Sequence, residues 1–239
     1  MGLADRLVAV SNYDPDDTAV GRPRVGDYQN VDWEKLAELR PGWMIMQGLP
    51  ERMPAGLSER ATSLGIRLVV LQIDRLDDIP RQMTRLGEAL AEPDAARNAV
   101  ERFNAKLERA RQQARQRTPP RTLIVLNELA TFVAGPGTFL DDVLQVAGGV
   151  NALDASSSGY PTIDRERLSV IAPDVIVQIL PGASDAVLWQ ARANWSQLPN
   201  LPAVRDGRVY VITEPWAMLP GYRQSELAER LAGLLHPRR

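Results

Sequence analysis

One stretch of this chain occurs twice. Residues Tyr28 to Ile45 read YQNVDWEKLAELRPGWMI, and Tyr160 to Val177 read YPTIDRERLSVIAPDVIV, without a gap and at a constant offset of 132 residues (160 − 28). A period this long is not that of a solenoid, so it predicts two lobes built on one plan. Two similar lobes enclose a cleft, and we expect the ligand site there. The identical matched pairs include Tyr28/Tyr160, Asp32/Asp164, Glu34/Glu166, Leu36/Leu168 and Pro41/Pro173.

The repeated stretch itself predicts a loop, a short helix and a strand. Asp32 and Asp164 stand where a helix N-cap is expected, and an acid follows in each first turn. Pro41 and Pro173 then stop each helix before the next apolar run.

Short apolar runs alternate with helical patterns along the chain, which predicts the α/β fold class with parallel sheets covered on both faces. The runs expected to be strands are Leu7 to Val10, Trp43 to Met46, Arg67 to Ile73, Thr122 to Leu126, Val175 to Leu180 and Arg208 to Ile212.

A long helix is predicted between the two copies. From Asp94 to Arg117 the chain has no glycine or proline, and Pro93 suits the first helical position. Such a helix is roughly 36 Å long at 1.5 Å per residue, and its place between the copies favours a rigid link over an ordinary surface helix. The predicted organisation is therefore an N-terminal Rossmann-like lobe (1–92), a linking helix (93–118) and a C-terminal Rossmann-like lobe (119–239).

The second lobe opens with elements that have no partner in the first. The strand Thr122 to Leu126 and a helix through Phe139 and Val146 precede its copy of the repeat. Internal symmetry predicts that the first lobe lacks its first strand and helix, a shortfall of roughly 25 residues.

Composition excludes several classes of protein. A net charge of −2 gives no general argument for nucleic acid or an anionic membrane, and no apolar run approaches the length of a bilayer span. We expect no signal peptide in the N-terminal MGLADRLVAV, which is short and acidic for one. Cysteine is absent, and the lone histidine, His236, is expected on the solvated tail, so a thiolate site or a histidine triad is not expected.

In order and spacing, four segments of the chain resemble the substrate-binding proteins of ABC importers for vitamin B12, haem and ferric siderophores. The segments are DRLVAVSNY, PRVGDYQNVDWEKLAELRPGWMI, GYPTIDRERLSVIAPDVIV and RDGRVYVITEPW, with the predicted linking helix between the second and the third. The resemblance covers nearly the whole chain. It implies a non-enzymatic protein, monomeric and outside the cytoplasm, that carries a small-molecule metal chelate to the membrane subunits of an ABC permease.

The matched tyrosines are the first candidates for ligand contact. Tyr28 and Tyr160 stand in loops that feed the repeated helices, where flat ligands are gripped by aromatic faces. The resemblance adds Tyr13 and Trp216, and more weakly Gln47, Phe132 and Arg223. Glu34 and Glu166 serve the helix dipole, and the resemblance implies a second role, docking onto the two halves of the permease.

No resident metal or cofactor is expected, because any iron would arrive chelated by its carrier or be held by tyrosine oxygen. Acidic siderophores call for arginine clusters, and only Arg223 is well placed, which favours a corrinoid or another neutral or mixed-charge chelate. Haem and a ferric siderophore are the alternative ligands.

Two rivals stay open: an α/β enzyme using carboxylates such as Asp14 and Asp16, and a cytosolic relative that has lost import. Ser156 to Ser158 are expected to form a loop, because no base is in reach. Three tryptophans have no matched partner in the repeat and are assigned to packing: Trp33, Trp189 and Trp195. Trp43 lies within a predicted strand and is assigned to the core.

Overall fold

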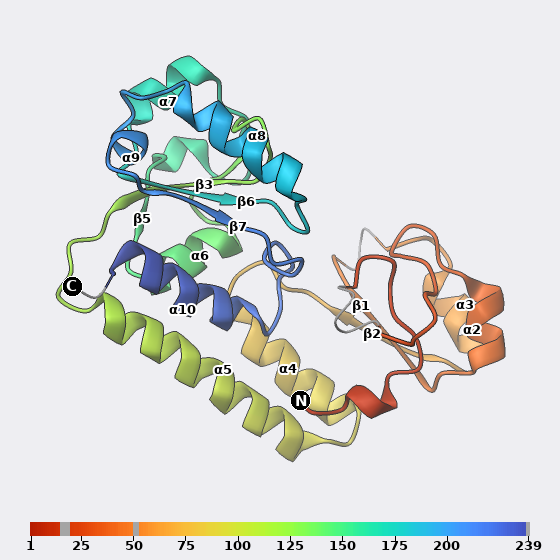
Figure 1. The fold of residues 1–239 in the computed structure, drawn as a ribbon. Coiled ribbons are helices and arrows are strands. Elements are labelled where there is room, and N and C mark those ends of the chain that lie inside the picture. The colour runs from red at the N-terminus through yellow and green to blue at the C-terminus, as the bar shows by residue number, and fades with distance from the viewer. Residues whose placement is uncertain (15–19, 50–52, 238–239) are drawn as a thin grey trace. The chain divides into compact units, whose positions relative to one another are not determined.

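A computed structural model describes residues 1–14, 20–49 and 53–237. The chain divides into two compact units (Figure 1). Unit 1 comprises Met1–Ile73 and Pro80–Val100, and unit 2 comprises Asp74–Ile79 and Glu101–Arg239. The division falls inside the predicted linking helix, which forms as α5 (Pro93–Ala114) with Pro93 at its start, 22 residues and so about 33 Å long.

Unit 1 is built around a small parallel sheet. Strands β1 (Trp43–Gln47) and β2 (Arg67–Leu71) pair in register from Trp43 opposite Arg67. Its other elements are η1 (Ala4–Arg6), α2 (Trp33–Leu39), α3 (Leu57–Ser63) and most of α4 (Asp78–Ala89). Leu36, Ala61 and Ile66 form a buried cluster where α2 and α3 cover the sheet.

The strand expected at Leu7 to Val10 is wrong. Val10 makes only an isolated bridge with Arg24. The Arg22 guanidinium donates to the carbonyls of Leu7 and Ala4 at 2.9 and 2.8 Å, so a side chain occupies the Leu7 carbonyl that a neighbouring strand would use.

Unit 2 contains a five-stranded sheet with the order β4-β3-β6-β7, and β5 also pairs with β3. All its pairings are parallel except β3 with β4. The strands are β3 (Arg121–Val125), β4 (Val133–Ala134), β5 (Val150–Asn151), β6 (Val175–Ile179) and β7 (Val209–Ile212). This confirms the α/β class with predominantly parallel sheets.

Helices cover both faces of the unit 2 sheet. Helices α6 and α10 lie on one face, and α7, α8 and α9 lie on the other (Figure 1). Their bounds are α6 (Phe139–Val146), η3 (Ala155–Ser157), α7 (Arg165–Ile171), α8 (Asp185–Ser196), α9 (Pro202–Arg205) and α10 (Gln224–Leu235). This double cover explains why β6 is buried along its whole length.

The two copies of the repeat fold alike. Helices α2 and α7 each have seven residues, and each N-cap aspartate accepts a hydrogen bond from the backbone three residues on. Arg40 and Ala172 close the helices in the left-handed conformation, and each is followed by the proline that prevents further helix.

The expectation that His236 is solvated is wrong. Its residue exposure is 5 %, and its Nε2 atom lies 3.1 Å from the Gly148 carbonyl oxygen. The histidine is the C-cap of α10 and packs near the end of α6. The local sequence, with Pro237 and Arg238 following, gives no sign of this tertiary contact.

Candidate functional site

The first candidate element is an aromatic pair in unit 1. The ring centroids of Tyr13 and Tyr28 lie 6.2 Å apart, and the two residues are 62 % and 49 % exposed. Tyr28 sits in a turn that Asp27 closes, because its carboxylate accepts from the N–H groups of Gln29 and Asn30 at 2.9 and 3.0 Å. These backbone donors, that of Asn30 foremost, hold the pKa of Asp27 below its usual value, so the turn carries a negative charge beside the ring.

A glycine and an arginine fix the loops that carry this pair. Gly26 has a φ of +88°, and a Cβ atom there would lie 2.0 Å from the Asn30 carbonyl oxygen. The Arg24 guanidinium donates to the carbonyls of Ser11, Asn12 and Asp14, which surround Tyr13. The loop conformation is therefore set by contacts between segments rather than by Tyr13 itself.

The second candidate element is an aromatic pair in unit 2. The rings of Phe132 and Tyr160 are stacked, with centroids 6.0 Å apart and planes 30° from parallel. The two residues are 37 % and 42 % exposed. Burial of its oxygen raises the pKa of Tyr160, partly offset by a hydrogen bond with Thr138, so Tyr160 is a neutral phenol at physiological pH.

The loops of this second pair are joined by backbone hydrogen bonds. The N–H of Ile163 donates to the Thr131 carbonyl at 2.7 Å, and Phe132 forms an isolated antiparallel bridge with Thr162. Farther along, the N–H of Gly135 donates to the Gly159 carbonyl at 2.7 Å. Phe132 and Tyr160 thus lie on two loops that backbone hydrogen bonds hold together.

Gly135 allows these loops to approach. A Cβ atom there would lie 2.0 Å from the Ser157 carbonyl oxygen, which is backbone and cannot rotate away.

We expect Gly135→Ala to lower the free energy of unfolding by about 3 kcal/mol, the cost of overpacking a rigid contact. Gly221→Ala is the matched control, because a Cβ atom at Gly221 meets no atom within 4 Å. Urea unfolding measures both, and equal midpoints would contradict the assignment.

Trp216 and Arg223 form a third feature in unit 2. The Arg223 guanidinium carbon lies 5.4 Å from the centroid of the Trp216 ring, within the range of a cation–π contact. The fully buried Gln224 donates from Nε2 to the carbonyls of Ala217 and Leu219 at 3.1 and 2.9 Å, and so holds the Trp216 loop. In unit 1, the exposed Gln47 ends strand β1.

The two predicted docking acids occupy equivalent places. Glu34 and Glu166 lie in the first turns of α2 and α7, and both are exposed. Their carboxylates face solvent at the positive ends of the helix dipoles, which suits helix stabilisation and recognition by a cationic partner alike.

The remaining acids and serines have local structural roles. Asp14 accepts from the N–H of Ser11 at 2.6 Å, Asp154 accepts from the N–H of Ser156 at 3.1 Å, and Asp16 lies outside the described residues. Ser156 belongs to the short η3 helix rather than to an irregular loop. Across the described ranges, histidine and acidic side chains nowhere gather in groups of three that could hold a metal ion.

The tryptophan assignments are partly wrong. Trp195 is buried at 3 % exposure and Trp33 packs against the unit 1 core, but Trp189 is 70 % exposed on α8. Trp43 is half-buried, with the Arg67 guanidinium 4.0 Å from its ring centroid. Trp189 lies on the outer side of a helix that buries Ala191 and Trp195, which the sequence did not reveal because α8 has only a weak apolar face.

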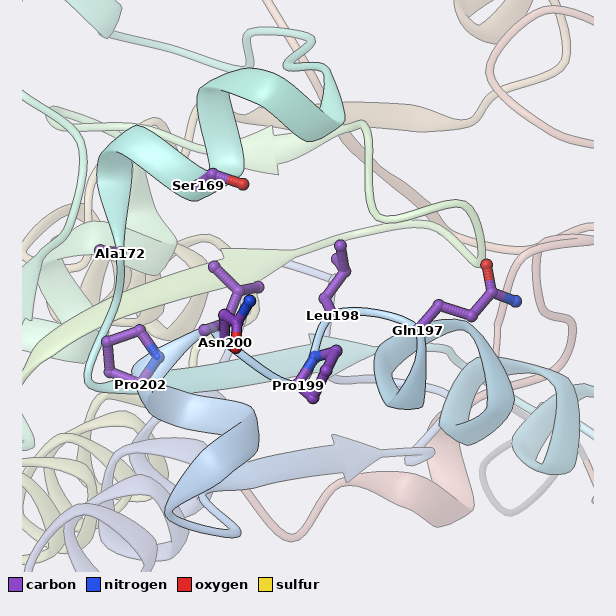
Figure 2. A pocket seen from close by; sticks show the side chains of 8 residues that line it. Ser169, Ala172, Gln197, Leu198, Pro199, Asn200 and Pro202 are labelled. Carbon is purple, nitrogen blue, oxygen red and sulfur yellow. The ribbon is translucent and has the colours of Figure 1, made fainter.

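Unit 2 also has a hollow of about 210 Å³ between the end of α7 and the segment that joins α8 to α9 (Figure 2). Drug-sized ligand pockets are larger, at roughly 300 Å³ or more. None of the predicted ligand residues lines this hollow. Its lining comprises Ser169, Ala172, Gln197, Leu198, Pro199, Asn200, Leu201 and Pro202. It is too small for a corrin or a porphyrin.

Sequence reasoning missed the side chains that hold the aromatic loops: Arg24, Asn127, Gln178 and Gln224. One signal was available. Gln178 interrupts the apolar run VIVQI, and a polar residue in a buried strand requires partners.

None of the described helices combines the length and apolarity needed to cross a bilayer.

Comparisons with known proteins agree with this architecture. The Vitamin B12-binding protein of Vibrio cholerae serotype O1 is 29 % identical over 237 residues, covering 98 % of this chain and 83 % of the relative. The crystal structure of the periplasmic vitamin B12 binding protein BtuF of Vibrio cholerae matches with a TM-score of 0.77 and 27 % identity, over 98 % of this chain and 89 % of that one. A periplasmic heme binding protein from Pseudomonas aeruginosa matches with a TM-score of 0.79 and 25 % identity, over 97 % and 85 %.

The family model described as "Periplasmic binding protein" matches residues 1–215, which include both copies of the repeat, both aromatic pairs and the long helix α5. The chain therefore belongs to the periplasmic binding protein family.

Proposed function

We propose that this chain is the substrate-binding component of an ABC importer and that it binds a corrinoid of the vitamin B12 type. The observation that carries the proposal is the presence of an exposed aromatic pair in each unit, Tyr13 with Tyr28 and Phe132 with Tyr160. Exposed rings offer broad apolar area at small entropic cost, which suits a flat macrocyclic ligand. The vitamin B12-binding and heme-binding relatives add support for a ligand of this shape.

The charges near the rings favour a neutral or mixed-charge chelate. Asp27 stays ionised beside Tyr28, and the Arg24 guanidinium is occupied by backbone carbonyls. Arg223, whose guanidinium lies over the Trp216 ring, is an arginine that would meet a ligand carboxylate or amide. A tri-acidic siderophore would require several such cations. Haem, with two carboxylates, is the alternative ligand, and the ferric siderophores rank below it.

The proposed mechanism is capture and delivery without covalent chemistry. The ligand arrives with its metal already chelated, since the chain offers no cysteine and its lone histidine is buried against Gly148. We propose that the protein acts as a monomer outside the cytoplasmic membrane. Glu34 of unit 1 and Glu166 of unit 2 would each meet basic side chains on one half of the permease.

Visible absorption spectroscopy tests the ligand class. Purified protein is titrated separately with cyanocobalamin, haemin and a ferric siderophore, and bound ligand is separated by gel filtration. We expect saturable one-to-one binding of cyanocobalamin with a shifted visible spectrum. Tighter binding of haemin would replace the corrinoid by the alternative ligand, and retention of none of the three would contradict the proposed function.

A further inference from the structure

The sheet of unit 2 carries a fully buried glutamine. Gln178 lies on β6, where the other residues of the strand are apolar, and its exposure is 0 %. At the matched position of unit 1 (178 − 132 = 46) the chain has Met46 on strand β1. A buried amide costs free energy unless both its oxygen and its nitrogen are paired, so the polar residue requires an explanation that the fold alone does not supply.

Both ends of the Gln178 amide are paired. Its Oε1 atom accepts from the Trp195 Nε1–H at 2.8 Å, and its Nε2 atom donates to the Asn127 carbonyl oxygen at 2.8 Å. Trp195 is on α8, and Asn127 follows strand β3. The glutamine thereby fixes the start of a loop to the helix that covers the sheet.

The loop that begins at Asn127 ends at Phe132. The Asn127 Oδ1 atom accepts from the N–H groups of Thr131 and Phe132 at 3.0 and 3.2 Å, and its Nδ2 atom donates to Thr131 Oγ1 at 2.9 Å. The N–H of Leu126 donates to the Phe132 carbonyl at 2.8 Å and closes the loop. One line of hydrogen bonds therefore runs from Gln178 through Asn127 to Phe132, the residue that stacks on Tyr160.

Two further features show that this loop is held rather than free. The Asn194 Nδ2 atom, next to Trp195 on α8, donates to the Glu128 carbonyl at 3.3 Å. Ala130 adopts a φ of +57°, an unfavourable conformation for a residue with a Cβ atom, and it is buried in the core. Such strain persists where surrounding contacts determine the backbone, and it is concentrated at functional sites.

We propose that Gln178 is a positioning residue that holds Phe132 in place for ligand contact through the Asn127 loop. The inference rests on the proposed function, since it assumes that the ring of Phe132 meets the ligand. Gln178 itself touches no ligand. Its role explains why unit 2 keeps an amide where unit 1 has a thioether.

Amide hydrogen exchange tests the positioning step without any ligand. Gln178→Met has nearly the parent volume and uses the residue that the matched strand already tolerates. Thr122→Val is the matched control, because it removes another buried hydrogen bond, from Thr122 Oγ1 to the Pro120 carbonyl, on the neighbouring strand β3. We expect the amides of Thr131 and Phe132 to exchange about tenfold faster in Gln178→Met than in Thr122→Val. Equal exchange in the two variants would overturn the proposal.

A double-mutant cycle tests the link to binding. Titration with cyanocobalamin and with haemin is repeated for Gln178→Met, Phe132→Ala and the combination. We expect Gln178→Met to weaken binding about tenfold in the parent and less than about twofold when Phe132 is already alanine. The same factor in both backgrounds would overturn the proposal, because Gln178 would then act on stability in general.

The two claims fail in different ways. If Phe132→Ala binds as tightly as the parent, the assignment of this aromatic pair to the ligand is wrong, and the role of Gln178 in binding is wrong with it. If Phe132→Ala weakens binding but Gln178→Met does not, the proposed ligand contact stands and the positioning role of Gln178 is contradicted.

Discussion

The double variant Glu34→Arg with Glu166→Arg is expected to abolish ligand uptake while leaving ligand affinity almost unchanged. Both carboxylates are exposed in the first turns of matched helices, and neither belongs to an aromatic pair. Like charges facing each other across an interface cost several kcal/mol, which is enough to prevent docking on a basic permease surface. Uptake is measured in cells that lack the native binding protein, and affinity by titration in solution.

A double reversal on the long helix is the matched control. Glu101→Arg with Glu108→Arg changes the net charge by the same amount at exposed positions of α5. This control should support normal uptake. If the Glu34 and Glu166 double variant also supports normal uptake, the two glutamates stabilise helix termini and nothing more. Single reversals should slow association with the permease and make it less sensitive to salt, because rim charges act chiefly on encounter.

Replacing Tyr28 or Tyr160 by alanine is expected to weaken ligand binding by roughly 1 to 3 kcal/mol each, which is about 5- to 150-fold in affinity. Each ring is one half of an exposed aromatic pair, and truncation removes its contact area and leaves the other ring of the pair without its neighbour. Isothermal titration with cyanocobalamin or haemin measures the effect. Thermal unfolding of the same variants should stay close to the parent, because neither ring is buried in a core cluster.

The phenylalanine variants separate the ring from its hydroxyl group. Tyr28→Phe and Tyr160→Phe keep the aromatic face, so both should bind nearly as tightly as the parent. A large loss in Tyr160→Phe would assign the contact to the phenol oxygen. Parent-like affinity in both alanine variants would exclude the tyrosine pairs from the site.

The repeat made much of the architecture predictable. Each repeated helix is defined by residues at its own ends, an N-cap aspartate and a proline after the C-cap, namely Asp32 and Pro41 or Asp164 and Pro173. The two helices form with the same length and the same kinds of cap. The long helix α5 was predictable for the same reason, since Pro93 and the following run without glycine or proline are local features.

The errors concern contacts between distant segments. Leu7 to Val10 has the composition of a strand, but the Arg22 side chain donates to the Leu7 carbonyl, which a neighbouring strand would otherwise use. His236 looks like part of a solvated tail, yet it is buried against Gly148, 88 residues away. No local pattern records such pairings, so propensity was overridden by tertiary structure.

The candidate site also combines residues that the sequence identified with long-range contacts that it did not. Tyr28 and Tyr160 were identified by the repeat, and the resemblance added Tyr13 and Phe132, but the contact between the two rings of each pair depends on loop geometry. Gln178 reaches Asn127 across 51 residues, and this distance explains why the residues that hold the site were not predicted.

A crystal structure of the protein with its bound chelate tests the central claim most directly. Cyanocobalamin or haemin, whichever binds more tightly, is the ligand to be used. We expect the bound ligand to contact Tyr28 and Tyr160. A ligand that leaves either tyrosine without contact, or that binds at the hollow lined by Ser169 and Leu198, would contradict this expectation.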